Sequence, residues 1–198
     1  NDFGYNMPEK LGVWKQASVE QKLIDFNVHQ VSKQIVIVTT NFELNAVKGN
    51  VVVNYKINSN GEILVETELK NIDENLPVLP KFGTNFIVKN DFDNVKWFGR
   101  GPYENYQDRN TSALLGLYSS KVANLYFPYT RPQENGYKTD VRWVEFTNKA
   151  GIGFIVEGTN LIGFGVHHNY NDDFDDGKEK QQRHTTDIKR KEIVNINI

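Results

Sequence analysis

The chain contains no cysteine, which excludes a disulfide framework, a thiolate nucleophile and cysteine-ligated zinc. Its 23 Lys+Arg residues nearly balance its 25 Asp+Glu residues, and the formal net charge of −2 comes without a basic tract. Nucleic acid and membrane surfaces are therefore not expected partners. No apolar run approaches the roughly 18 residues of a membrane span, and the first residues lack the basic and apolar regions of a signal peptide. We expect either a soluble protein without a targeting signal or a segment of a longer protein.

Short β-branched runs broken by turn residues occupy residues 22–72 and predict a β-meander. In the run VVVNYKI, Val53, Tyr55 and Ile57 alternate with Asn54 and Lys56, which predicts one buried and one wet face. The next run, ILVETEL, has the same pattern. These two runs are separated by NSNG, where Asn-Gly predicts a tight hairpin with positive φ at both turn positions.

Similar strand-like runs begin near residues 86, 95, 141, 151 and 161, whereas a helical period is scarce. The best helical candidate, Thr111 to Leu125, is short and is interrupted by Gly116. We therefore predict an all-β sandwich forming a single domain over residues 1–198. The last run, Glu192 to Ile198, is expected to be an unprotected apolar edge, which native sheets avoid. We expect that a C-terminal continuation of the domain is missing.

Two polar clusters stand out, one in WFGRGPYENYQDR (97–109) and one in RPQENG (131–136). Both mix planar hydrogen-bonding groups with aromatic rings or glycine and proline, a mixture that suits sugars because hydroxyls bind planar groups while C–H faces stack on rings. The alternative is that arginine and carboxylate side chains pair with one another and hold the loops. With one further arginine and a His-His pair, the candidate carbohydrate-binding residues are Arg100, Glu104, Asn105, Tyr106, Asp108, Arg109, Arg131, Gln133, Glu134, Asn135, Arg142, His167 and His168.

Some of these residues allow sharper hypotheses. Glu104 and Glu134 could be a glycosidase acid and nucleophile only if they stood about 5 Å apart, a distance that sequence does not supply. Asp108 with Arg109, and Asp140 with Arg142, are predicted to be structural ion pairs. His167 and His168 follow one another at a strand end, so their rings should point to opposite faces and not share a metal.

Three blocks in register resemble the C-terminal, small-chain region (domain 5) of lacZ-type β-galactosidases of glycoside hydrolase family 2. They are VLPKFG (78–83), WFGRGPYENYQDRNTSALLGLY (97–118) and YFPYTRPQENGYKTDVRWVEFTN (126–148). The resemblance covers nearly the whole chain. It implies a galactose-mutarotase-like supersandwich, C-terminally truncated before a loop that reaches the substrate site.

The resemblance also implies a role. In this family the catalytic glutamates and the magnesium ligands lie on a separate barrel that is absent from this chain, so no catalytic residue, metal ligand or cofactor is expected here. Mg²⁺, with Na⁺ as a second ion, is implied for the parent enzyme, a retaining hydrolase of terminal β-D-galactosyl residues such as those of lactose. The implied partners are the remaining domains, the galactoside and further copies in a homo-oligomer, in a bacterial cytoplasm or periplasm.

Three roles stay open for the polar surface. It is either a scaffold that supports the catalytic barrel, a carbohydrate-binding surface, or a mutarotase-like site in which His167 or His168 works with Glu104 or Glu134 as acid and base. The first predicts that Arg100 and Arg109 bind carboxylates or carbonyls of neighbouring loops.

Overall fold

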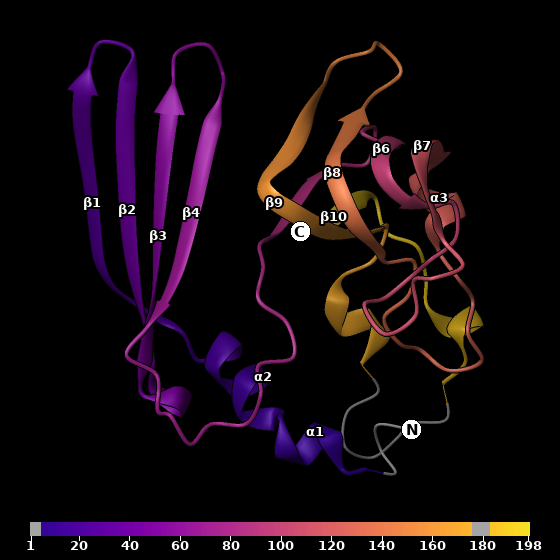
Figure 1. Ribbon diagram of the computed structural model, residues 1–198, viewed down its shortest axis with the longest axis horizontal. Helices are drawn as coiled ribbons and strands as arrows, with labels where there is room; N and C mark the ends of the chain where they lie inside the picture. Colours follow the sequence, from indigo (N-terminus) through magenta and orange to yellow (C-terminus); the bar gives the residue numbers. More distant parts are fainter. Residues whose placement is uncertain (1–4, 176–182) are drawn as a thin grey trace. The chain divides into compact units, whose positions relative to one another are not determined.

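The computed structural model describes residues 5–175 and 183–198, and within it the chain forms two compact units, residues 1–82 and 83–198 (Figure 1). Both units are built on antiparallel β-sheets, which confirms the predicted all-β class. The assignment of residues 1–198 to one domain stays a prediction. No helix among the described residues is long and apolar enough to cross a membrane.

The first unit is a four-stranded meander that follows two short helices, as the early part of the chain in Figure 1 shows. Its sheet order is β1-β2-β3-β4, as predicted from the four β-branched runs. The elements are α1 (Met7–Lys10), α2 (Gly12–Val19), β1 (Lys22–Ser32), β2 (Ile35–Leu44), η1 (Asn45–Val47), β3 (Gly49–Asn58) and β4 (Ile63–Lys70).

The β3–β4 hairpin differs from the prediction in its turn. Only Gly61 has a positive φ, of 89°, and Asn60 does not. The amide of Gly61 donates to the carbonyl of Asn58 at 3.0 Å, and the amide of Asn58 donates to the carbonyl of Glu62 at 2.9 Å. This is a three-residue loop in which a type I turn is followed by a left-handed glycine. The loop is longer than predicted because Ser59 takes part in it.

The register of the sheet places apolar side chains of β3 and its neighbours on one face, since Val38 pairs with Tyr55 and Tyr55 with Val65. The predicted contrast of one buried and one wet face is wrong. Val53, Asn54 and Tyr55 are all partly buried, and Ile57 is 38% exposed. The core of this unit lies only where α2 and η1 cover the sheet, and consists of the buried side chains of Ala17, Leu44 and Val47.

Helix α2 was missed, because eight residues make about two turns, too few for a period to stand out. It is held by the indole of Trp14, which donates to the carbonyl of Pro77 at 2.9 Å. The segment from Thr111 to Leu125, whose sequence is too short and interrupted for a helix, is mostly strand β7, and its last four residues form α3.

The second unit is a six-stranded antiparallel sheet with the order β5-β10-β9-β8-β6-β7. Its large connections carry only short helical turns (Figure 1). The elements are β5 (Asn85–Lys89), β6 (Asn94–Gly101), β7 (Leu114–Lys121), α3 (Val122–Leu125), β8 (Lys138–Thr147), β9 (Gly153–His167), η2 (Asn171–Phe174), η3 (Thr185–Asp187) and β10 (Ile193–Asn197).

One face of this sheet carries the main core. Trp97 of β6, Phe146 of β8 and Phe164 of β9 are fully buried, and their rings lie 5.7 Å (Trp97 to Phe164) and 6.4 Å (Phe146 to Phe164) apart. Burial of such rings supplies large apolar areas and holds the strands in register. The other buried members of the core are Val95, Val122, Leu125, Val141, Val144, Val166, Val194 and Ile196.

The final strand is not the unprotected edge that the sequence predicted. Strand β10 pairs with β5 on one side and β9 on the other, and Val194 and Ile196 are fully buried. The edges of this sheet are β5 and β7. Sequence could not reveal this, because the partners of β10 lie far away along the chain. An open edge at β10 was the reason to expect a missing C-terminal continuation, and the structure removes that reason.

Candidate functional site

Two loops at one end of the second sheet contain most of the candidate residues. Strand β6 runs into the loop that contains Glu104, and the loop that contains Asn135 runs into β8. Because β6 and β8 are antiparallel, with Phe98 opposite Trp143, the end of one strand lies beside the start of the other. The two polar motifs therefore lie close together.

Glu104 binds several segments of these loops, and its side chain is only 11% exposed. Its Oε1 accepts hydrogen bonds from Nη2 of Arg109, at 2.8 Å, and from the hydroxyl of Tyr129. Its Oε2 accepts from the amide of Gly136, at 2.8 Å. Three donors from three parts of the chain thus occupy both carboxylate oxygens, which suits a fixed anion that joins loops.

Two buried asparagines fasten the same loops to the main chain. The Oδ1 of Asn105 accepts from the amide of Thr139 at 2.9 Å and from its hydroxyl at 2.6 Å. The Oδ1 of Asn135 accepts from the amide of Phe127 at 2.9 Å, and its Nδ2 donates to the carbonyl of Gln133 at 3.0 Å. Both side chains therefore satisfy main-chain groups that would otherwise be buried without partners.

Arg100 binds groups within the protein, as predicted. Its carboxylate partner is Asp140, which was predicted to pair with Arg142 instead. Its Nε donates to Oδ2 of Asp140 at 2.5 Å, and its Nη1 donates to the carbonyl of Ala113 at 2.9 Å. Arg142 was expected to pair with the Asp140 carboxylate. Instead its Nη1 donates to the main-chain carbonyl of Asp140 at 2.5 Å. That predicted ion pair is wrong because Asp140 has a positive φ of 53° at a bulge, which redirects its side chain.

The other predicted ion pair is also wrong. Arg109 pairs with Glu104, five residues earlier, and not with the adjacent Asp108, which is exposed. The guanidinium of Arg109 also lies 5.4 Å from the ring centre of Tyr106. Neighbouring residues in an irregular loop often point apart, so adjacency was a poor guide to pairing here.

Tyr106 stacks on Tyr137, with ring centres 5.7 Å apart. Its hydroxyl is buried and has no hydrogen-bond partner among residues 5–175 and 183–198. Burial, and then the charge of Glu104, raise the pKa of Tyr106. The ring therefore serves as packing for the loop and not as an acid near neutral pH.

A buried lysine that sequence reasoning missed lies beneath these loops. Lys138 is 1% exposed, its Nζ donates to the carbonyl of Gly136 at 2.8 Å, and it lies 5.6 Å from the ring centre of Trp97. Burial lowers the pKa of Lys138 to about 8, although the charge of Glu104 acts in the opposite direction. No signal in the sequence marks this lysine, since most lysines are exposed.

His167 is the last residue of β9 and His168 follows it, and the two side chains bond to different segments. Nε2 of His167 lies 2.9 Å from the carbonyl oxygen of Asn135. Nδ1 of His168 lies 2.7 Å from the carbonyl oxygen of Ile193, and its Nε2 lies 3.3 Å from Oδ1 of Asp93. In the described part of the chain no group of three His, Cys, Asp or Glu side chains could hold a metal.

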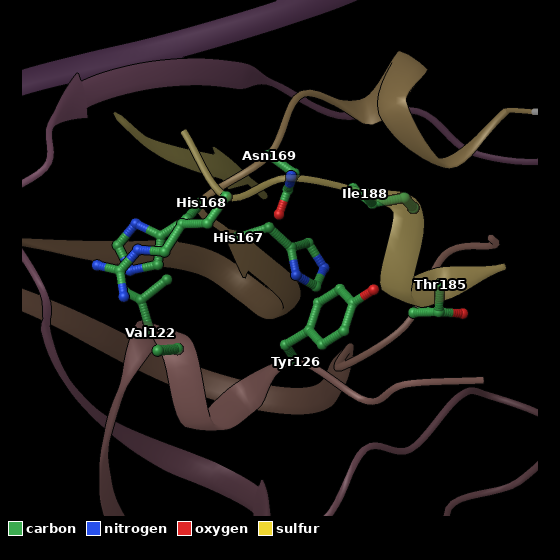
Figure 2. Close-up of a pocket in the computed structure, with 9 residues that line it drawn as sticks. Val122, Tyr126, His167, His168, Asn169, Thr185 and Ile188 are labelled. Atoms are coloured by element: carbon green, nitrogen blue, oxygen red, sulfur yellow. The ribbon is translucent and has the colours of Figure 1, made fainter. Parts of the chain in front are cut away.

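Both histidines line a pocket of about 180 Å³, shown in Figure 2. The pocket brings β9 together with α3, η3 and the segment before β10. Asn169, Thr185 and Arg190 were missed by sequence reasoning because they lie in connections without a motif, and Tyr126, at the start of the third sequence block, was not singled out. The described lining residues are Val122, Ala123, Tyr126, His167, His168, Asn169, Thr185, Ile188 and Arg190.

The remaining candidates are dispersed. Arg131, Gln133 and Glu134 are exposed on their loop, while Arg142 lies against the ring of Phe98, 5.4 Å from its centre. The structure thus gathers Glu104, Asn105, Tyr106, Arg109 and Asn135 in one cluster and links it to His167 through Asn135.

Comparisons with known proteins agree on one family. A family model described as "Beta galactosidase small chain" matches residues 1–198. The chain is 39% identical over 162 residues to a beta-galactosidase of Priestia megaterium, which covers 82% of this chain and 16% of that protein. It is 34% identical over 163 residues to a beta-galactosidase of Lactobacillus delbrueckii subsp. bulgaricus, which covers 81% of this chain and 16% of that protein. The chain therefore spans about one sixth of the length of these curated relatives.

Proposed function

Because the chain belongs to the beta-galactosidase small-chain family, we propose that it is a non-catalytic domain that supports the catalytic part of a β-galactosidase. The parent protein would be a retaining hydrolase of terminal β-D-galactosyl residues, such as those of lactose. Mg²⁺ and Na⁺, which the family resemblance implies for the parent enzyme, would be held by other parts of that protein. The remaining domains, and further copies of the parent, would be its partners.

One observation carries this proposal: the carboxylate of Glu104 is fully engaged by donors of the protein itself. A glycosidase acid or nucleophile must face the sugar with a free oxygen. Glu104 instead joins three loop segments, as a structural anion does. The amides of Asn105 and Asn135 are likewise engaged with main-chain groups. The polar loops are therefore supporting architecture.

The experiment compares Glu104→Gln with Asp108→Asn in the full-length parent enzyme. Asp108 lies on the same polar loop and is exposed, so its replacement is a matched control. For Glu104→Gln we expect a loss of about 2 kcal/mol in stability, because hydrogen bonds to a charged group are among the stronger ones. At low temperature, kcat/KM on a chromogenic galactoside should change by only a small factor.

A catalytic role would give the opposite pattern. Removal of a general acid or base lowers the rate by about 10²- to 10⁴-fold. Such a loss in Glu104→Gln with unchanged thermal stability would contradict the proposal. So would cleavage of the galactoside by the purified 198-residue chain alone.

The alternative functions, a stand-alone carbohydrate-binding module or an aldose epimerase, have less support. An epimerase needs an acid and a base on either side of the sugar ring, but one ring nitrogen of each histidine is engaged with a main-chain carbonyl. Galactose should therefore leave the melting temperature of the chain unchanged. A ligand that binds only the folded state would raise it by mass action.

A further inference from the structure

We propose that the pocket beside His167 and His168 binds a small hydroxy carboxylate, with the carboxylate on Arg190 and the hydroxyl on Asn169. This site is separate from the polar loops and does not depend on the function proposed above. Its volume of about 180 Å³ lies below the roughly 300 Å³ at which sites for drug-sized ligands begin, so the ligand is small.

The charge of the pocket selects an anion. Arg190 is its one permanently charged side chain among the described lining residues, and none of these residues is a carboxylate. Two acids lie close to the lining residues. Asp93, behind His168, is engaged by that ring at 3.3 Å and by Nζ of Lys121 at 3.4 Å. Asp187, next to Ile188, accepts from the amide of His184 at 2.7 Å. Arg190 itself is exposed, and its contact among the described residues is a long one of 3.5 Å to Oδ1 of Asn90. Its planar guanidinium is thus available to take a carboxylate in a bidentate manner.

The second recognition element is an acceptor. Asn169 is buried, and its Nδ2 donates to the carbonyl of Lys189 at 2.9 Å, which fixes the orientation of the amide. Its Oδ1 receives no hydrogen bond from the described residues, and Figure 2 shows this oxygen on the side of His167 and Tyr126. An amide oxygen held in this way accepts a hydrogen bond from a hydroxyl and disfavours a second carboxylate.

The histidines complete the walls of the pocket. Nε2 of His167 is engaged by the carbonyl of Asn135, and Nδ1 of His168 by the carbonyl of Ile193. Together with Val122 and Ile188, the rings give apolar walls for the carbon body of the ligand. One cation, one acceptor and apolar walls match a short hydroxy acid better than an inorganic anion.

The test is an amide NMR titration of the 198-residue chain with L-lactate at constant ionic strength, up to high millimolar concentration. Propionate lacks the hydroxyl and lactamide lacks the charge, so the three probes separate the two recognition elements. We expect lactate to shift the amides of Asn169, Thr185 and Arg190, with propionate weaker and lactamide without effect. No saturable shift with lactate, or equal affinities for lactate and propionate, would overturn the proposal.

Three variants test whether lactate binds in this pocket. Arg190→Gln should weaken lactate binding about 10- to 100-fold, as expected for a lost charge-assisted bond. Lys189→Gln is the matched control, because it removes an adjacent exposed cation that does not line the pocket, and it should bind as the unaltered chain does. Ala123→Phe should block the pocket from an exposed position without a change of charge. Undiminished binding by Arg190→Gln or by Ala123→Phe would refute the assignment.

Discussion

Replacing Lys138 by methionine should make the protein more stable near neutral pH and remove a pH dependence in the alkaline range. Burial lowers the pKa of Lys138 from its ordinary 10.5 to about 8 in the folded protein. This gap of about 2.5 pH units corresponds to about 3 kcal/mol, at about 1.36 kcal/mol per unit. Below pH 8 Lys138 is charged in both the folded and the unfolded protein, so the free energy of unfolding is lower by this whole amount. Methionine removes the cost but leaves the carbonyl of Gly136 without its donor, a loss of about 1 to 3 kcal/mol.

The sign of the pH dependence follows from proton binding. Between pH 8 and 10.5 the unfolded chain holds the proton of Lys138 and the folded chain loses it, so the free energy of unfolding rises with pH. From pH 7.5 to 9.5 the expected gain is about 2 kcal/mol. The pKa of Tyr106 is raised in the folded protein, so that tyrosine acts in the opposite direction, but only as pH nears 10.

The assay is urea-induced unfolding at pH 7.5 and 9.5, followed by tryptophan fluorescence, for the unaltered chain and for Lys138→Met. The difference between the two proteins cancels the contribution of the tyrosines, because both proteins contain them. We expect the unaltered chain to gain about 2 kcal/mol relative to the variant between the two pH values. Equal pH dependences would refute the reasoning that this lysine is buried as a charged group.

Further predictions concern the loops and the core. Arg100→Ala should lower the free energy of unfolding by about 3 kcal/mol, because it leaves a partly buried carboxylate and two carbonyls without their donor; a loss within error in urea unfolding would contradict this. Phe146→Ala should cost about 3 to 5 kcal/mol because its ring is fully buried, whereas Phe127→Ala, at a ring 49% exposed, should cost far less in the same measurement. Gly136→Ala should lower the melting temperature much more than Gly151→Ala: both have positive φ, but a Cβ at the first would collide with a main-chain carbonyl oxygen, and one at the second meets open space. Equal effects of the two glycine changes would show that the collision is relieved at little cost.

The strands of the first unit were predictable because their information is local. Alternation of Val53, Tyr55 and Ile57 with polar residues has the period of a strand whatever the strand packs against. The hairpin turn was placed correctly, but its type depended on whether Ser59 joined the loop. Helix α2 escaped detection since its two turns become stable through contacts with residues distant in sequence, such as that of Trp14 with Pro77.

The partners within the candidate site could not be predicted in the same way. The sequence marked Arg100, Glu104, Arg109 and Asn135 as chemically notable, and adjacency then suggested pairs that the structure replaces. A strand bulge and loop curvature decide which carboxylate an arginine meets. The buried Lys138 had no signal at all, because its burial follows from the loops that cover it.

By itself, the sequence determined the all-β class, the strands of the meander and the family. Each of these depends on local periodicity or on long motifs that are specific in their residue order. Tertiary structure alone decided that β10 lies inside its sheet, that Glu104 is engaged by three donors, and that Asn169, Thr185 and Arg190 meet around one pocket. The physical reason is that these features join segments far apart in sequence, and their contacts depend on strand order and loop paths that no local pattern encodes.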